Sequence, residues 1–479
     1  MNTRTPCSPV DRESLLAAIA VCTNTCLDAC GKVNTDLAGV EQAVAIAVAE
    51  FTKRMRQAGT DEAMSQPLPW TCPDCGQMLG YHDTQHKGVV LRQGLVDLSR
   101  GRYRCGVCGS DHVPVDVLND LEGTGFSLGA REVGVTEAVK MAFAPASVQV
   151  KPTLPVSAKS LERMVAEVAG WRQEEQAEAV RAYYGDRTKP GLLPTGSPMP
   201  LVNWEPGELP EQAVLCIAAD GGFVRSTTKG KDGKLEWFEA RVGTISVTHE
   251  GKELPLKVAG GKFYVAGTLE LDDLFEMLGV AYETLPPQLK ALPSVFTGDG
   301  GHWWERCKEH FPQAQDILDL YHAGDHLGSA AALCFGEGTA RTRQWREHAR
   351  EWLKQPGQLE ERLGELFHSR PSVKADAEAH HKLLNHIAYF REHRHRMHYW
   401  DYEAWGLPLG SGVIESGVKQ TVAARARQAG MKWTRKHAHN MLCLRAAYLS
   451  AEVPGIFHRR REACLQEARH FCETLQLAA

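Results

Sequence analysis

Hydrophobic residues along the chain change their spacing near residue 210. Apolar positions recur at helical intervals in residues 11–63 and again in residues 127–183, where Ser157 is a candidate N-cap. Beyond residue 210 the pattern becomes continuous apolar runs, which are typical of buried strands. Six prolines with interleaved glycines separate the two regions, over residues 185–210. We therefore predict an N-terminal part with helices, a linker, and a C-terminal part built on a sheet.

The segments after residue 210 predict a definite order of elements. Three strands are followed by a helix, a strand, a second helix and a fifth strand, over residues 214–219, 236–247, 262–266, 271–278, 294–299, 303–311 and 316–322. That succession is the order of an RNase H-like core, in which the first and fourth strands are neighbours. Residues 325–405 are predicted to be mostly helical and to interrupt this core. The fold class predicted is therefore α+β and multidomain, with a mixed sheet.

Composition adds broad limits. The 479 residues are 43% hydrophobic and 24% charged, which is ordinary globular usage and sufficient for two to four domains. No apolar run reaches the roughly 20 residues of a membrane span, and the first residues do not resemble a signal peptide. We expect a cytoplasmic protein without a membrane partner. The formal net charge of −5 gives no sign of nucleic acid for the chain as a whole, so partners are judged segment by segment.

Two Cys-x-x-Cys pairs stand about 29 residues apart, with short predicted strands between them. Their thiols belong to Cys72, Cys75, Cys105 and Cys108. Each pair offers two thiolates at the edge of a tetrahedron, and glycines beside both pairs suit tight turns, so a four-sulfur structural zinc site is predicted. Reduced cysteines in unrelated turns, or a redox pair, are the alternatives. A further row, Cys22, Cys26 and Cys30, is interpreted as packing within a helix.

Two aspartates follow two of the predicted strands, and each is set among glycines. Asp220 ends the first strand and Asp299 ends the fourth, so the RNase H-like order would place them side by side. Two close carboxylates repel unless a cation lies between them, and hard oxygen ligands suit Mg²⁺. Glu415 follows Gly-Ser-Gly at the start of a later helix and is the predicted third carboxylate. Each acid has an alternative interpretation as a loop or helix cap.

The motifs around these acids resemble those of a known family. Asp220-Gly, Gly298-Asp-Gly, Asp319-x-x-His322 and Gly410-Ser-Gly-Val-Ile-Glu415-Ser are similar to motifs of the DDE transposases of ISKra-type insertion sequences, which are related to the Mutator-like group. The similarity extends to Gln428-Ala-Gly-Met-Lys-Trp433 and Leu444-Arg-Ala-Ala-Tyr-Leu449, and covers most of the chain from about residue 70. Related groups carry Cys-x-x-His where this chain has Asp319-x-x-His322.

The resemblance implies a reaction and its participants. Asp220, Asp299 and Glu415 would bind two Mg²⁺ (or Mn²⁺) ions that activate water or a 3′-hydroxyl for cleavage and strand transfer on DNA. His322 is a further candidate catalytic residue, and a satisfied core histidine is its alternative. Asp316, Asp319 and Asp325 are alternatives for the second aspartate. The implied partners are double-stranded transposon ends and target DNA, a homodimer or larger assembly, and a nucleoid location when bound to DNA.

Basic residues after Glu415 are the predicted path of a DNA backbone. They are Lys419, Arg425, Arg427, Lys432, Arg435 and Lys436. Arginines interleaved with tryptophans at 341–352 and 391–400 could add phosphate contacts and base stacking, although core packing is favoured for Trp345 and Trp352.

The complete division predicted from the sequence has eight parts. They are an N-terminal helical region (1–66), a zinc ribbon (67–120), a helical module that is either a helix-turn-helix DNA reader or a packing unit (121–184), a linker (185–210), the first part of the catalytic core (211–328), a helical insertion (329–408), the last part of the core (409–450) and a helical tail (451–479). A nuclease of the same fold that only hydrolyses DNA, and a DNA-binding regulator derived from a transposase, are the competing functions.

Overall fold

The structure, a computed structural model, describes most of the chain. Described are residues 69–185, 200–255, 261–299, 301, 303–373 and 376–471, with isolated positions before residue 61. The predicted helices of residues 11–63, the cysteine row at 22–30 and most of the linker lie outside these residues. The chain divides into two compact units, Met1–Met164 with Val453–Ala479, and Val165–Glu452. Within the described ranges, no helix has both the length and the apolar character needed to cross a membrane.

The first unit contains a three-stranded antiparallel sheet and several helices. The sheet has the order β1 (Leu79–Leu91), β2 (Gly94–Cys105), β3 (Asp111–His112). Its strands β1 and β2 are longer than the sequence suggested, because they pair along their whole length across a two-residue turn, residues 92–93, which Gly94 follows with a φ of 125°. The helices are α3 (Pro114–Leu118), α4 (Leu128–Lys140), α5 (Phe143–Val150) and α19 (Val453–Arg469).

One long helix, α6 (Ala158–Tyr184), begins at the predicted cap, because the Ser157 hydroxyl accepts a hydrogen bond from the Ser160 amide at 3.1 Å. The N-cap prediction is confirmed. In the first unit, α4 packs against α5 and the first turns of α6: a Cβ added at Gly134 would lie 2.9 Å from a Leu161 methyl group.

A mixed sheet forms the centre of the second unit. Its strands are β4 (Val214–Lys229), β5 (Leu235–His249), β6 (Lys252–Glu253), β7 (Phe263–Gly267), β8 (Ser294–Gly298) and β9 (Gln315–Leu318). The order is β6-β5-β4-β8-β9, and β7 also pairs with β5. Strands β4, β8 and β9 are parallel, whereas β5 is antiparallel to β4 and β7. The prediction that the first and fourth strands are neighbours is confirmed, since β4 pairs with β8.

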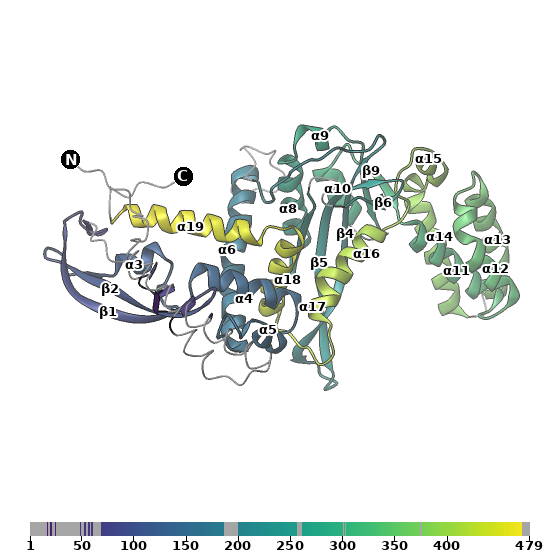
Figure 1. Ribbon diagram of the computed structural model, residues 1–479. Coiled ribbons are helices and arrows are strands. Elements are labelled where there is room, and N and C mark those ends of the chain that lie inside the picture. Colours follow the sequence, from purple (N-terminus) through teal and green to yellow (C-terminus); the bar gives the residue numbers. More distant parts are fainter. Residues whose placement is uncertain are drawn as a thin grey trace. The chain divides into compact units, whose positions relative to one another are not determined.

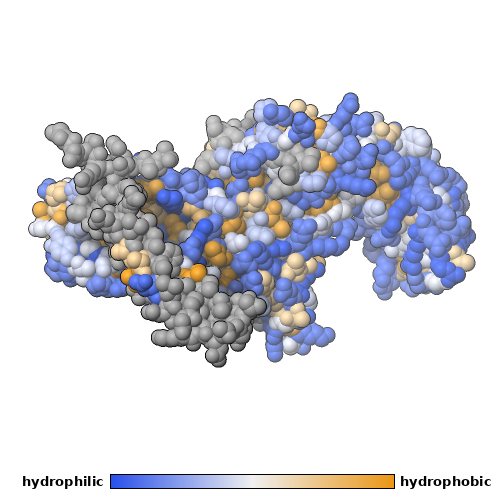
Figure 2. All heavy atoms as spheres, viewed as in Figure 1, coloured by the Kyte–Doolittle hydropathy of each residue, from blue (hydrophilic) through white to orange (hydrophobic). Residues whose placement is uncertain are grey.

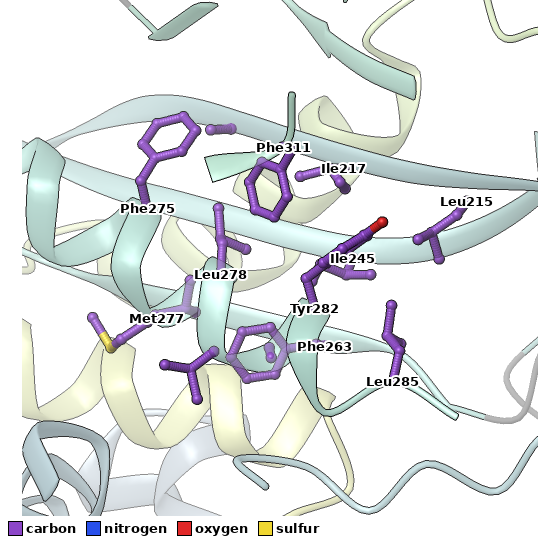
Figure 3. Close-up of a cluster of buried hydrophobic side chains, with 14 of the residues drawn as sticks. Leu215, Ile217, Ile245, Phe263, Phe275, Met277, Leu278, Tyr282, Leu285 and Phe311 are labelled. Carbon is purple, nitrogen blue, oxygen red and sulfur yellow. The ribbon is translucent and has the colours of Figure 1, made fainter. Parts of the chain in front are cut away.

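Residues alternate between the two faces of this sheet. On one face, Leu215, Ile217, Ile245 and Phe263 pack against side chains of the helices, and Figure 3 shows Phe275 and Leu278 among them. That face is covered by α8 (Leu271–Glu283), α9 (Pro287–Lys290), α10 (Trp303–His310) and the C-terminal part of α6. On the other face, Cys216 and Val295 pack against residues of α11 (Leu320–Phe335) and the helices that follow it.

The helical segment between β9 and the helix of Glu415 is present as predicted. It contains α11, α12 (Ala340–Leu353), α13 (Gln358–Val373), α14 (Ala377–His393), a 3₁₀ turn (Arg394–Arg396) and α15 (Tyr399–Ala404). Helices α11 to α14 lie together beside the sheet (Figure 1), and their outer surface is mainly hydrophilic in Figure 2. Trp345 is 2% exposed, so its predicted place in the core is confirmed.

The C-terminal part of the second unit returns to the sheet. It runs through α16 (Gly412–Val418), a π-helical turn (Lys419–Ala423), α17 (Ala424–Ala426) and α18 (Arg435–Leu449). Helix α16 packs on β4 and β5, and α18 packs on β7. A π-helical turn inside an α-helical segment is uncommon and often marks a functional site.

Candidate functional site

The four cysteines of the two Cys-x-x-Cys pairs come together at one end of the first sheet. Their sulfur atoms all lie within 4.8 Å of one another, with Cys72 to Cys108 at 3.6 Å and Cys75 to Cys105 at 3.4 Å. A tetrahedral zinc ion with bonds of about 2.3 Å needs sulfur separations of about 3.8 Å. The four cysteines could therefore hold a structural zinc ion.

Local turns produce this arrangement. The Gly76 amide donates to the Cys72 carbonyl at 2.8 Å, and the Gly109 amide donates to the Cys105 carbonyl at 3.0 Å. Both glycines have positive φ, 72° and 76°, which residues with a Cβ rarely adopt. The sequence analysis missed His112, whose Nε2 lies 3.6 Å from the Cys72 sulfur and which forms a second possible ligand group with Cys72 and Asp74.

A cavity of about 240 Å³ opens at the edge of the second sheet where β4 and β8 run parallel. The three predicted carboxylates, Asp220, Asp299 and Glu415, all line it. The other lining residues are Ala219, Gly298, Asp319, Tyr321, His322, Asp325, Ser411 and Ile414. Segments that are about 80 and 115 residues apart in the chain thus contribute acids to one space. Their oxygens do not all lie within 4.8 Å of one another, since the only described groups that meet this limit are in the first unit.

Strand β4 does not end at Asp220, contrary to the sequence prediction. It continues to Lys229: Phe223 to Ser226 alternate in exposure, and Phe223, Val224, Arg225 and Lys229 pair with β5. What ends near Asp220 is the pairing with β8, whose last register pair is Ala218 with Thr297. Asp220 and Asp299 each lie two residues beyond that pair, and both extend their strands on the side of Cys216 and Val295. The two acids therefore point to the same face at the same edge, as the strand order predicts.

Close packing explains why glycines follow Asp220. A Cβ on Gly222 would lie 3.0 Å from Val418 Cγ1, and one on Gly221 would lie 2.4 Å from a Glu239 oxygen. Gly417, on α16, likewise faces Thr244 of β5 at 3.3 Å. Small residues on both sides therefore let α16 and the π-helical turn lie directly on β4 and β5, which brings Glu415 to the cavity.

Little positive charge balances the three acids. The Asp220 carboxylate accepts from the Gly221 amide at 2.7 Å, and Asp299 accepts from the Gly301 amide at 3.0 Å. Among the described residues, the only ion pair of the three joins Glu415 to Lys419, at 3.6 Å on the surface. Burial, followed by the negative charges of Asp299, Glu415 and Glu239, raises the pKa of Asp220 to about 6. Uncompensated carboxylates of this kind fit a divalent cation.

The raised pKa predicts a gain in stability when Asp220 is made neutral. Because the folded state holds the proton more tightly than the unfolded chain, this group destabilises the fold as pH rises from about 4 to about 6, and the cost is then constant at higher pH. We expect Asp220→Asn to raise the free energy of unfolding by about 1–2 kcal/mol at pH 8, allowing for partial exposure, and to change it little at pH 4. Thermal unfolding at both pH values measures this, and Glu208→Gln, at an exposed carboxylate, is the control. Equal stability of Asp220→Asn and the parent at pH 8 would contradict the electrostatic account.

The predicted fifth strand, 316–322, is shorter in the structure, and Asp319 caps a helix instead. Strand β9 ends at Leu318, and Asp319 is the N-cap of α11, so His322 lies in the first turn of that helix. One carboxylate oxygen accepts from the His322 amide at 2.6 Å, and the other accepts from the Ser411 amide. The Ser411 hydroxyl then donates to the Glu415 carboxylate at 3.2 Å. Asp319 is 2% exposed, and it fixes the segment that carries Glu415 relative to α11.

Asp319→Asn is expected to weaken binding of an added divalent cation at this cavity by about 10- to 100-fold, because an amide nitrogen in place of one oxygen cannot accept from the Ser411 amide. Calorimetric titration of the protein with Mn²⁺ measures this effect. Asp376→Asn is a matched control, since Asp376 caps α14 with amide contacts of 2.9 and 3.0 Å but does not line the cavity. If both variants lose stability but keep the metal affinity of the parent, Asp319 acts only as a helix cap and does not position the metal ligands.

His322 lines the cavity and lies beside other aromatic groups that the sequence analysis missed. Its ring lies 5.0 Å from that of His326, whose Nδ1 is 3.1 Å from Nδ1 of His386 and whose ring stacks on Tyr389 at 3.9 Å. Burial, with the charges of His386 and His322, lowers the pKa of His326 to about 4, so His326 is neutral at pH 7. The i, i+4 spacing of His322 and His326 was visible in the sequence, but the approach of α14 was not.

Five of the six predicted DNA-contacting residues are exposed, and one is not. Lys419, Arg427, Lys432, Arg435 and Lys436 are exposed. Arg425 is 1% exposed, and its guanidinium carbon lies 5.2 Å from the centre of the Trp433 ring, so it does not reach the surface in this structure. Burial lowers the pKa of Arg425 to about 10. The prediction that Arg425 contacts a DNA phosphate is therefore corrected, because α17 turns this side chain inward.

Comparison with protein-family models and with curated protein sequences found no match to this chain.

Proposed function

We propose that the chain is a DDE transposase that binds the ends of an insertion sequence and catalyses Mg²⁺-dependent DNA strand cleavage and strand transfer. The observation that carries the proposal is that Asp220, Asp299 and Glu415, from three distant segments, line one cavity. Structural caps would not be expected to gather in this way, because close carboxylates without a cation destabilise the fold. The resemblance to ISKra-type transposases gives the same three residues.

The sheet supports an RNase H-like core as the scaffold of this site. Apart from the two-residue strand β6, the sheet reads third, second, first, fourth and fifth strand from one edge to the other. The second strand is antiparallel to its neighbours and the first, fourth and fifth are parallel. In this proposal the helical insertion separates the fifth strand from the helix that supplies the glutamate.

The residues present fit a pair of Mg²⁺ ions, with Asp220, Asp299 and Glu415 as ligands. Two such ions would supply Lewis acidity toward a scissile phosphate and lower the pKa of the attacking water or 3′-hydroxyl. The protein itself holds the ligands in place: the glycines after Asp220 admit α16, and the Asp319 and Ser411 hydrogen bonds orient Glu415. His322 lines the same cavity, and in this proposal it would contact the phosphate or a proton of the attacking group.

DNA and further copies of the chain are the proposed partners. The exposed side chains of Lys419, Arg427, Lys432, Arg435 and Lys436 would neutralise phosphates. The cysteine cluster, with zinc bound, would hold a ribbon that contributes to end recognition together with α4 and α5. Bringing two ends together requires at least a dimer, and DNA binding would place the protein at the nucleoid.

A single assay separates the proposed activity from its competitors. Full-length protein with its zinc retained is incubated with end-labelled DNA that carries the sequences flanking its gene on both sides, with a plasmid target, and either with Mg²⁺ or with no added divalent cation. A transposase joins labelled ends to the plasmid only when Mg²⁺ is present. Cutting without joining indicates a nuclease, and binding without cutting indicates a regulator; either result contradicts the proposal.

A further inference from the structure

Strands β4 and β5 extend beyond the rest of their sheet. The pairing of β4 with β8 stops at Ala218, and that of β5 with β7 involves only residues 241–245 of β5. Residues 222–229 and 235–240 therefore form a two-stranded hairpin, which projects from the sheet at the bottom of Figure 1. An isolated hairpin is only marginally stable in water, so both of its faces need an explanation.

One face of this hairpin is covered. Val224 and Phe238, on this face, are 0% and 4% exposed, and the segment around Trp433 forms a parallel bridge with Ser226 at the edge of β4. The Trp433 amide donates to the Arg225 carbonyl at 3.0 Å, and the Thr227 amide donates to the Trp433 carbonyl, also at 3.0 Å. Arg435 lies 5.1 Å from the Phe238 ring. These contacts hold the hairpin in place.

The opposite face carries large aromatic side chains in the open. Phe223 is 58% exposed and Trp237 is 52% exposed. Arg225, between Phe223 and the turn, pairs with Trp237 in the register and lies 5.1 Å from the centre of its ring. Strict alternation puts all three on one face, so their exposure follows from the strand period and is not an accident of one rotamer.

Area and charge favour one occupant for this face. Two aromatic rings offer about 150–250 Å² each, well below the roughly 800 Å² per partner of a stable protein interface. Residues 223–241 contain five cations (Arg225, Lys229, Lys231, Lys234 and Arg241) and three acids (Asp232, Glu236 and Glu239), a net charge of +2 in a chain of net charge −5. Arg427, whose Nε donates to the Phe223 carbonyl at 2.6 Å, adds an exposed cation at the edge of β4. Exposed rings among cations are the features that bind unpaired bases and their phosphates.

We propose that Phe223 and Trp237 form a stacking platform for unpaired bases of a DNA strand, with Arg225 and the hairpin lysines contacting its phosphates. The inference rests on the proposed function, because unpaired bases arise when a DNA end is opened for cleavage. It adds a binding surface that lies outside the metal cavity and uses none of the residues assigned to catalysis.

The test measures binding of the full chain, with its zinc retained, to a fluorescein-labelled strand of 20 thymidines by fluorescence anisotropy, in buffer without added Mg²⁺. The Trp237→Ala variant and the Phe223→Ala variant should each bind about tenfold more weakly than the parent, since stacking on one ring contributes an effect of this order. Trp237→Phe should bind nearly as the parent does, whereas Trp237→Leu should be as weak as the alanine variant. The control is Trp405→Ala, at an indole that is 61% exposed but lies in the helical insertion.

Salt separates stacking from phosphate contacts. The tenfold loss in Trp237→Ala should be the same at about 50 and 300 mM KCl, while Lys231→Ala should lose less at the higher concentration. Unchanged binding by both alanine variants, or full binding by Trp237→Leu, overturns the platform. If the alanine variants change their oligomeric state but bind DNA as the parent does, the aromatic face binds a second copy of the chain and the stacking platform is wrong. Mg²⁺-dependent cleavage of duplex ends is scored separately, so the platform can fail while the transposase proposal stands.

Discussion

Replacing Asp299 with asparagine is expected to reduce Mg²⁺-dependent DNA cleavage by about 10³-fold or more, with DNA binding unchanged. Asparagine keeps the size of the side chain and the oxygen that accepts from the Gly301 amide, but it removes the negative charge. Metal-ion catalysis lowers the barrier by several kcal/mol through charge, and each 1.4 kcal/mol corresponds to about a factor of ten. Single-turnover cleavage of a labelled duplex, with anisotropy for binding, measures both quantities.

Asp325→Asn is the matched comparison for this variant. Asp325 lines the same cavity from α11 and lies 3.8 Å from Arg350, so it has a partner outside the proposed metal site. We expect a change of less than about fivefold for this variant, because surface ion pairs contribute little. Loss of cleavage in Asp325→Asn with activity retained in Asp299→Asn would show that the second aspartate is wrongly assigned.

Removing zinc is the second change with a large expected effect. The described ribbon buries few apolar residues: one cluster has Trp70, Leu79 and Phe471 with two of the cysteines, and another has three residues of β1 and β2 with Leu121. Cores of this size rarely hold a sheet without a metal or disulfide, and zinc binding supplies about 10 kcal/mol or more to such domains. Cys105→Ser, or chelation by a strong zinc ligand, should therefore unfold the β1–β2–β3 sheet while the second unit stays folded.

Hydrogen exchange read by mass spectrometry distinguishes the two units in this experiment. Amides of β1 and β2 should lose protection after zinc removal, whereas those of β4 and β5 should keep it. Cys334→Ser, at a cysteine of α11 outside the cluster, serves as the control and should leave both sheets protected. Persistent protection of β1 and β2 in zinc-free protein would mean that the four thiols only pack together.

The adjacency of β4 and β8 in the second sheet could be predicted from local sequence signals and from the order of the elements. Apolar runs followed by Asp-Gly marked β4 and β8, and their order along the chain implied that they are adjacent. The continuation of β4 to Lys229 was missed because Asp220-Gly-Gly looks like a strand end. In the folded chain those glycines instead make room for α16 and Glu239, a tertiary requirement that local sequence does not reveal.

Other features depend on contacts between distant segments and could not be predicted. Asp319 follows an apolar run, as a residue at a strand end would, but its hydrogen bond to the Ser411 amide is set by a loop 92 residues later. The same holds for Arg425, which was predicted to contact phosphate because it lies in a basic segment, but which is buried beside Trp433. His326 and His386 approach each other only because α11 and α14 pack side by side. The sequence pointed to three acids that line one cavity, whereas the residues that surround them depend on packing.

The most direct test of the central claim is to locate Mn²⁺ in crystals of the full chain by its anomalous scattering. The account predicts at least one peak in the cavity, at about 2.0–2.2 Å from oxygens of Asp220, Asp299 and Glu415, and its loss in crystals of Asp299→Asn. Well-ordered crystals with saturating Mn²⁺ and no peak among these three side chains would contradict it.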